Sequence, residues 1–333
     1  MEANQEEARR EEGRERGPDV KHQVAAALIA AMEQSNTPWQ KPWSASSMRP
    51  INGATLNAYR ATNRILLALQ GRADPRWLTY RQAAEKGWQV RGGERGTMIV
   101  KLVELGPGER SDEAERQEAA GESGTTDRKR MVLRRYFVFN AEQIDGVPPM
   151  EPEEQAREFE PAERAEKVLQ ALREKTGLVI AYGGAQAFYD PKADKIQLPQ
   201  RKKFRSAYDL AATQFHEAGH STLAKHRLDR RDALGERWGD EAYAMEELRA
   251  EICSAILAAE TGVPMCQDPK HVANHAAYLR SWVSGARKDP LAIFAAARDA
   301  ERMAEYLLGM ERQLVAMAEH KEWVDEYERA PAR

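Results

Sequence analysis

The sequence predicts an α+β fold in two domains, a small mixed domain followed by a larger and more helical one. Length and charge are two of the reasons. The chain has 333 residues, enough for two domains of ordinary size. Residues 20–105 carry twelve Lys and Arg against five Asp and Glu, a net charge of +7, so the rest carries −10 of the total of −3. A basic part joined to an acidic part indicates that the basic part meets a polyanion.

The third reason is the segment 147–161, which is rich in proline and acid and is typical of a linker. We therefore place the first domain at 20–146 and the second at 162–320. Residues 1–19 are charged nearly throughout, and residues 106–130 contain no apolar side chain larger than Ala or Pro. Both segments are predicted to be disordered, the first as a tail and the second as a loop within the first domain.

Hydrophobic periodicity predicts the elements of each domain. In the first domain the pattern predicts three helices, at 20–34, 57–70 and 79–86. It also predicts two strands, at 97–104 and 134–139. The second domain is expected to open with a helix at 162–175, followed by short strands near 177–182, 186–190 and 194–198. Four more helices are then expected, at 206–225, 240–260, 270–284 and 290–310.

Cysteine content and hydropathy indicate the cellular setting. The chain has two cysteines, Cys253 and Cys266, and no CxxC pair, which is typical of a reducing compartment. No apolar run reaches the ~18 residues that would span a membrane. The charged start is unlike a secretory leader. We therefore expect a cytoplasmic protein without a membrane partner.

The sequence HEAGH at residues 216–220 carries the strongest chemical signal. A helix turns by about 100° per residue, so His216 and His220 share one face. Residues 206–225 are largely apolar; unpaired histidines would be costly there, whereas a metal would satisfy them. Two imidazoles and one carboxylate leave a fourth position for water, as in catalytic zinc sites, and Glu217 would take a proton from that water. The alternative is a surface helix with two solvated histidines.

One possible third ligand is His226, six residues after His220, which is the metzincin spacing. That scheme normally needs a glycine at position 223 to swing the chain back to the metal, and Leu223 stands there. The helix is therefore expected to continue and to carry His226 about 240° away from His220. On this reasoning we reject the metzincin scheme.

The other possible third ligand is a glutamate from the next helix, as in gluzincins. Within residues 240–260, Glu247 and Glu251 are four apart and share a face. One can bind the metal while the other orients a ligand histidine through the free ring N–H. In gluzincin-type sequences the ligand is the first acid of such a pair, which favours Glu247 and gives Glu251 the orienting role, although the spacing leaves both open. Glu246 is expected on a solvated acidic face.

The basic part of the chain is also rich in aromatic residues, several of them in turn contexts: Trp39, Trp43, Tyr59, Trp77, Tyr80 and Trp88. Rings interleaved with cations suit single-stranded DNA, because unpaired bases stack on aromatics while Lys and Arg follow the phosphates. The alternative is that some rings form a small core, and Trp77 and Trp88 could be of either kind. Nothing resembles a helix-turn-helix, a zinc finger or a Gly-rich phosphate loop, so sequence-specific reading of duplex DNA is not expected.

Several longer stretches form a recognisable set. In the first half they are PWQKPW, NAYRATN, WLTY, GGERGT and YFVFNAEQI, beginning at Pro38, Asn57, Trp77, Gly92 and Tyr136. In the second half they are HEAGH, WGDEAY and NHAAY, beginning at His216, Trp238 and Asn274. With these stretches the chain resembles the ArdC-type antirestriction proteins of plasmids from about Val20 to Leu308. Its first half also resembles the leader region of TraC-type plasmid primases.

The resemblance implies a domain that binds single-stranded DNA, joined to a zincin-like (gluzincin-type) metallopeptidase domain. It also implies that incoming plasmid DNA is protected from host restriction, and that the partners are single-stranded DNA and a restriction-related host protein or peptide. The expected metal is zinc, with Mn or another divalent ion as the alternative. The candidate DNA-binding residues are Trp39, Lys41, Trp43, Tyr59, Arg60, Asn63, Arg64, Trp77, Tyr80, Arg81, Arg95 and Lys101.

The expected reaction is hydrolysis of a peptide bond, with Glu217 as general base. His275, with Tyr278 one turn along, would stabilise the developing oxyanion, although His275 could equally be a packed helix histidine. The strand around residues 187–189 would offer an edge to an extended peptide. A DNA-coating protein with an inert metal domain is the alternative function. A nuclease ranks last, because phosphodiester cleavage usually uses carboxylate-rich two-metal sites.

Overall fold

The computed structural model describes five ranges, 48–104, 131–150, 161–230, 240–263 and 291–329, with positions 22, 23, 25, 26, 29 and 289. The predicted tail, the predicted loop, most of the linker and the predicted helix 270–284 lie outside the described residues, as does most of the predicted helix 20–34. Within the described ranges, no helix is both long enough and apolar enough to cross a membrane.

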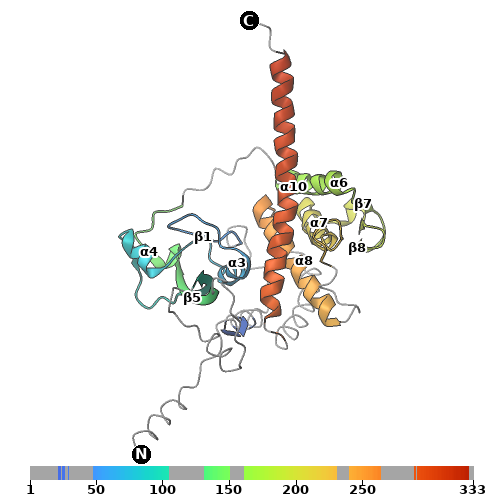
Figure 1. Cartoon of the computed structure of the whole chain (residues 1–333). Helices are drawn as coiled ribbons and strands as arrows, with labels where there is room; N and C mark the ends of the chain where they lie inside the picture. The colour runs from blue at the N-terminus through green and yellow to red at the C-terminus, as the bar shows by residue number, and fades with distance from the viewer. Residues whose placement is uncertain are drawn as a thin grey trace, which may run out of the picture.

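Within residues 48–104 and 131–150, the N-terminal domain is a mixed sheet with two short helices (Figure 1). Its four-stranded sheet has the order β1-β2-β5-β4, with β1 (Ile51–Asn52), β2 (Arg76–Leu78), β5 (Met131–Asn140) and β4 (Thr97–Glu104). A two-stranded ladder pairs β3 (Gln89–Val90) with β6 (Ile144–Asp145). The helices are α3 (Ala61–Ala68) and α4 (Tyr80–Glu85), with a 3-10 turn, η1, at Ala141–Gln143. The longest pairing is the antiparallel β4–β5 hairpin, which runs from Thr97 opposite Val138 to Glu104 opposite Met131.

Two capping boxes fix the short turns of this domain. The Thr79 hydroxyl accepts from the backbone N–H of Gln82, and the Gln82 side chain accepts in return from the Thr79 N–H, which begins α4. Asn140 and Gln143 form the same arrangement at the end of β5. Each box satisfies backbone donors that the first turn leaves without partners. The sequence TYRQ, which begins at Thr79 directly after Leu78, therefore starts a helix immediately after strand β2.

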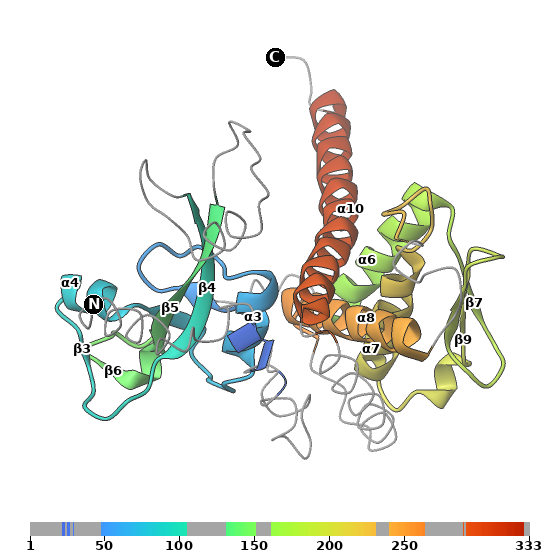
Figure 2. The same ribbon diagram turned by 60° about the horizontal axis from the view of Figure 1, so that its bottom comes forward.

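The C-terminal domain packs helices against a three-stranded sheet (Figure 2). The sheet has the order β7-β9-β8, so β7 (Val179–Tyr182) and β8 (Phe188–Asp190) are both edges around β9 (Lys195–Leu198). β7 is parallel to β9, and β8 is antiparallel to it. The helices are α6 (Pro161–Thr176), α7 (Ala207–Ser221), α8 (Asp240–Thr261) and α10 (Ala292–Arg329), with a 3-10 turn, η2, at Arg201–Lys203. The observed elements confirm the predicted α+β class.

Helix α10 joins the two domains. It packs on α8 and α6 of its own domain and on α3 of the N-terminal domain (Figure 2). One apolar core runs through this junction, and it includes Leu66 of α3, Leu169 of α6 and Ala300 of α10. The domain whose charge predicts DNA binding is therefore docked on the helical domain through α3.

Three predicted boundaries are wrong, and each has a local cause. Helix α7 ends at Ser221, not near 225, because the Ser221 and Thr222 hydroxyls donate back to the carbonyls of Ala218 and Gly219 and the chain then turns. Helix α10 continues to Arg329 beyond the predicted end at 310, through a sequence of good helix formers that needs little burial. Helix α3 begins at Ala61, after an isolated bridge between Ala58 and Ile51. The short strands β1, β2, β3 and β6 were not predicted.

Candidate metal centre

The two histidines of the HEAGH sequence lie on one face of α7, which Ser206 caps at its N-terminus. The Ser206 hydroxyl accepts from the backbone N–H of Asp209, and an acid in the first turn suits the helix dipole. The glycine of the motif allows α8 to come close. A Cβ at Gly219 would lie 3.4 Å from the Ala250 Cα atom and 3.3 Å from the end of the Met303 side chain, so α7 and α8 pack closely here. This close approach brings the acidic run of α8 to the histidines.

His216, His220 and Glu247 converge on one point. The two Nε2 atoms are 3.1 Å apart, and the Glu247 carboxylate oxygens lie 3.3 Å from Nε2 of His216 and 3.4 Å from Nε2 of His220. Donors around a tetrahedral ion with bonds of about 2.0–2.2 Å are separated by about 3.3–3.6 Å. Two imidazoles and one carboxylate at these separations therefore fit a zinc-type site that keeps one position open.

Two further carboxylates hold the rings. Oε2 of Glu251 is 3.3 Å from Nδ1 of His216, and Oε1 of Glu246 is 3.3 Å from Nδ1 of His220. Because a carboxylate only accepts, each Nδ1 carries the proton, and each Nε2 is directed at the shared point. Glu251 thus lies where an orienting partner of His216 is expected, with Glu247 rather than Glu251 among the converging donors.

The expectation for Glu246 is wrong, because this residue is 2% exposed and not solvated. Arg230 binds the Glu246 carboxylate through two nitrogens at 2.9 Å each, and also donates to the Thr222 hydroxyl. Arg230 reaches Glu246 because α7 ends at Ser221 and the chain then reverses its direction. Nothing in the local periodicity marks Arg230 as a partner of the histidine site.

The pKa values of the metal-free site reflect these contacts. Burial lowers the pKa of both imidazoles, but the carboxylates beside them outweigh it, so the pKa of His220 is raised to about 9 and that of His216 well above 6.5. Burial raises the pKa of Glu247, but the contacts with the two histidines lower it more, so this pKa lies below the usual range of a glutamate. A metal ion entering the site would therefore displace protons from the histidines.

Glu217 is 6% exposed, on the helix that carries both histidines. Among the described residues no side chain forms a hydrogen bond or ion pair with its carboxylate. His226 does not join the cluster; its Nε2 lies 3.3 Å from Asp194, in the turn that follows α7. The metzincin spacing fails because the chain turns after Ser221, and not because the helix continues.

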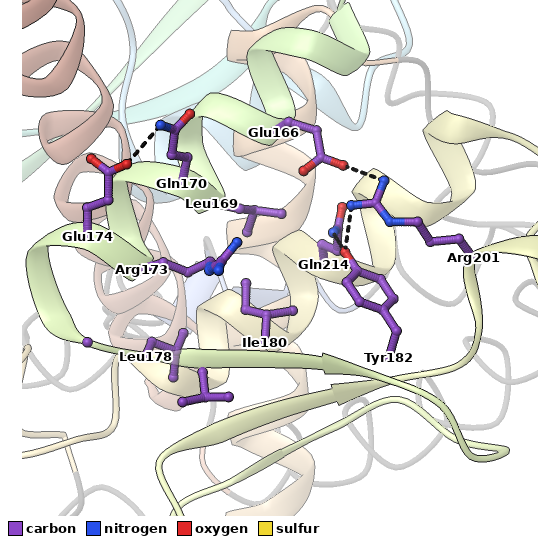
Figure 3. Close-up of a pocket in the computed structure, with 12 residues that line it drawn as sticks. Glu166, Leu169, Gln170, Arg173, Glu174, Leu178, Ile180, Tyr182, Arg201 and Gln214 are labelled. Carbon is purple, nitrogen blue, oxygen red and sulfur yellow. Dashed lines mark hydrogen bonds and ion pairs between the residues drawn. The ribbon is translucent and has the colours of Figure 1, made fainter.

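The opposite side of α7 borders a separate groove between α6 and the edge strand β7 (Figure 3). Gln214 of α7 donates to the Tyr182 hydroxyl at 2.8 Å, and Arg201 donates to the same oxygen at 3.1 Å. Gln214 is two residues before His216, which on a helix places it on another face. This groove is therefore distinct from the candidate metal site. The strand expected to offer an edge to an extended peptide, which contains Phe188, is β8, and it forms the other edge of the sheet.

The predicted DNA-binding residues divide into buried, paired and exposed groups. Trp77 is 2% exposed in a core with Leu67 and Val138, so its ring is not open to a base; this corrects the expectation for Trp77. Arg64 is 4% exposed and binds Glu301 of α10 at 3.0 Å, so it is a junction residue and not a phosphate ligand.

Three more members of this set have partners within the chain. Arg60 pairs with Glu305 of α10, and the Tyr59 hydroxyl accepts from Asn52 at 3.0 Å. Asn63 exchanges two hydrogen bonds with the backbone of Val100, so it ties α3 to β4. The other described members, Tyr80, Arg81, Arg95 and Lys101, are exposed, as is the paired Arg60, and Arg81 also pairs with Glu85 at 2.7 Å. Trp39, Lys41, Trp43, His275 and Tyr278 lie outside the described residues.

The β4–β5 hairpin exposes aromatic side chains that sequence reasoning did not select. Phe137 is 52% exposed and Tyr136 is 37% exposed. The usable signal is their position directly after Arg134 and Arg135 in one strand, where cations and rings are neighbours.

Comparisons with known proteins match both halves. Residues 18–139 match the family described as the N-terminal domain of anti-restriction factor ArdC, and residues 164–299 match a zincin-like metallopeptidase family. Two proteins of Escherichia coli named DNA primase TraC are 42% and 39% identical over 302 and 316 residues. These alignments cover 88% and 92% of this chain but only 27% and 21% of the primases.

Two further relatives are similar over nearly their whole length. An uncharacterised protein of Sinorhizobium fredii, y4eC, is 36% identical over 300 residues, which is 87% of this chain and 91% of that protein. The crystal structure of the antirestriction protein ArdC from plasmid R388 is 34% identical, with a TM-score of 0.67, and covers 89% of this chain and 99% of that one. Its Mn(II)-bound form has a TM-score of 0.66 and the same identity, with coverage of 88% and 98%. On this likeness along the whole chain, the protein belongs to the ArdC family of antirestriction proteins.

Proposed function

We propose that this protein binds single-stranded DNA through its N-terminal domain and hydrolyses a peptide bond at the centre formed by α7 and α8. Together these activities would protect incoming plasmid DNA from host restriction, in the cytoplasm, with a restriction-related host protein as the peptide substrate. The observation that carries the peptidase proposal is the convergence of His216, His220 and Glu247 at separations of 3.1–3.4 Å.

His216, His220 and Glu247 would hold a divalent metal, zinc by donor type, or the Mn(II) that the R388 protein binds. When bound, the metal supplies a Lewis acid next to a water molecule. Glu251 and Glu246 fix the ring orientations, so the two Nε2 atoms stay directed at one point. Glu217 takes the proton of the attacking water and passes it to the departing amine. His275 and Tyr278 remain candidates for stabilising the oxyanion.

The test of the peptidase is the pair wild type and Glu217→Gln, which keeps the shape of the side chain and removes its basicity. We expect zinc-loaded wild type to cleave members of a quenched-fluorescent peptide library. Glu217→Gln should bind one equivalent of zinc and cleave none of them. Equal cleavage by both proteins would rule out Glu217 as the base. No cleavage by either, with intact binding of DNA, would favour the DNA-coating alternative.

Single-stranded DNA binding is supported by the net charge of +7 over residues 20–105 and by the exposed side chains of Tyr80, Arg81, Arg95 and Lys101. Affinity for a labelled single-stranded oligonucleotide should fall as salt rises, with a slope of about −0.7 per phosphate contact. A duplex of the same sequence should bind more weakly. Binding that ignores salt, or that prefers the duplex, would contradict the proposal.

A further inference from the structure

A second concave site lies on the N-terminal domain, away from the metal centre. It is a pocket of about 680 Å³ between the start of α4, the β3–β6 ladder and the end of β5. Its walls include an aromatic pair, Tyr80 and Phe139, and a polar edge formed by Gln89, Arg91 and Asp145. None of Gln89, Arg91, Phe139 and Asp145 was among the residues expected to bind DNA.

The aromatic wall presents a flat ring to solvent. Tyr80 is the first residue of α4, directly after the capping residue Thr79, and is 55% exposed. Its ring meets Phe139 edge to face, with centroids 6.4 Å apart at 70°. The Gln89 amide donates to the Tyr80 hydroxyl at 3.3 Å and to the backbone carbonyl of Val90 at 2.9 Å. The ring is therefore held at its edges while part of its surface stays open to a flat ligand.

The polar edge is unsuited to phosphate. Among the described residues that line the pocket, Arg91 is the one cation. It lies 3.1 Å from a Glu94 oxygen and 3.4 Å from an Asp145 oxygen, and it donates to the Glu142 carbonyl. One cation with two carboxylates leaves the edge with a net charge of −1, which repels a phosphate. The polar groups are well suited instead to the edge of a base, which is neutral and carries N–H donors.

Asp145 is placed to accept from such a donor. It stands directly opposite Gln89 in the β3–β6 ladder, so the two side chains lie on the same face. The Asp145 side chain is 65% exposed, and its contact with Arg91 engages Oδ1. A carboxylate accepts from the amino group of cytosine or adenine, whereas the corresponding position of thymine is itself an acceptor.

We propose that this pocket binds one unpaired nucleobase, stacked on Tyr80, with Asp145 accepting from its exocyclic amino group. The inference rests on the proposed single-stranded DNA binding and adds a specific contact to it: a base that carries an amino group is preferred to thymine at one position of the bound strand. The phosphates on either side would be left to cations outside the pocket, such as Arg81 and Arg95.

The experiment measures affinity of the full-length protein for fluorescein-labelled 15-mers of dC and of dT, which are both pyrimidines and have similar stacking areas. Wild type should bind the dC strand about 5-fold more tightly, as one base-edge contact allows. Tyr80→Ala should lower affinity for both strands by about 5- to 100-fold, the range for losing one stacked base. Asp145→Ala should remove the preference for dC while keeping most of the affinity for dT.

Gly92 provides a second way to block the pocket. Gly92 lines the pocket, a Cβ atom there meets nothing within 4 Å, and its φ is not in the left-handed region, so Gly92→Leu adds a bulky side chain at the pocket wall without a backbone clash. It should weaken binding as Tyr80→Ala does. The matched control is Tyr136→Ala, which removes an exposed ring outside the pocket and should leave the preference for dC unchanged.

The outcomes separate the two proposals. If wild type binds neither strand, both the DNA-binding function and the pocket fail. If wild type binds with the expected salt dependence, but Tyr80→Ala and Gly92→Leu bind equally well and dC is not preferred, the pocket alone is overturned. Loss of affinity in both pocket variants, with the dC preference removed by Asp145→Ala, supports the base site.

Discussion

The acids of helix α8 have two kinds of partner: a first, buried group lies beside histidines, and a second, the partly exposed Glu260, lies beside an arginine. Glu246, Glu247 and Glu251 face the histidines of α7, whereas Glu260, near the end of the same helix, faces Arg64 at 3.1 Å. Histidine can lose its proton and offer a lone pair, so the first group can admit a metal ion. Arginine keeps its charge and offers only donors, so the second group is a permanent ion pair. The partner, and not the acid, decides which acids can take part in binding a metal ion and which help to hold the domains together.

The junction carries the largest expected effect on stability. Arg64→Met removes the cation that Glu301 and Glu260 share and leaves the Glu301 carboxylate, 10% exposed, without it. Removing one partner of a buried pair typically costs about 3–5 kcal/mol, and we expect a loss of that order in the free energy of unfolding, measured in urea.

The control for Arg64 is Arg60→Met on the same helix. The Arg60 side chain is 58% exposed although it also pairs with α10, so its replacement should cost less than about 1 kcal/mol. Equal losses of unfolding free energy in the two variants would mean that the Arg64 ion pairs are as solvated as a surface pair. Arg64 would then not be the residue that holds the domains together.

The reactive group is tested by Glu247→Gln, which keeps the size of the side chain and removes a charged donor. Zinc affinity, measured by competition with a chromophoric chelator, should fall by more than about 100-fold, beyond the usual effect of an outer partner. Glu260→Gln on the same helix should bind zinc as wild type does. If Glu251→Gln shows the larger loss instead, the third ligand is Glu251.

The contact between Glu246 and His220 predicts a smaller loss of zinc affinity. Replacing a carboxylate that orients a ligand histidine typically costs about 10- to 100-fold in metal affinity, which we expect for Glu246→Gln. Arg230 would keep only part of its pairing in this variant, so the unfolding free energy should fall as well. An unchanged zinc affinity would show that Glu246 serves Arg230 alone.

The smallest effect concerns the ion pair between Asp194, whose side chain is 31% exposed, and the buried Arg227, which follows α7. Burial raises the pKa of Asp194, but hydrogen bonds from Arg227 and Tyr189 outweigh it and hold that pKa below 3.8. A lowered folded-state pKa stabilises the protein above the unfolded value, and that stability is lost as the pH falls through the folded value. Asp194→Asn should therefore be less stable than wild type at pH 7, and the difference should shrink below about pH 4 in urea titrations at several pH values. If the difference in the free energy of unfolding were the same at every pH, the charge of the Asp194 carboxylate would not be its cause.

Local sequence patterns predicted the features that depend on neighbours a few residues apart. The four-residue spacing of His216 and His220 places both on one face of any helix that contains them, and Glu247 and Glu251 follow the same rule on α8. The strand predicted at 97–104 is β4, with the same bounds, because an apolar stretch of that length beside turn residues favours one conformation. These results follow from helix and strand geometry, which needs no knowledge of the rest of the chain.

The tertiary structure decided which surfaces meet. Arg64 and Glu301 are 237 positions apart, and no local pattern indicates that a cation on α3 would be buried against α10 rather than exposed to DNA. Trp77 is buried by packing with Leu67 and Val138, although the turn and basic residues around it in the sequence are equally compatible with an exposed ring. Glu246 finds Arg230 because α7 ends early and the chain reverses. Periodicity determines the face on which a side chain lies; what that face packs against depends on contacts between distant segments, which only the folded chain brings together.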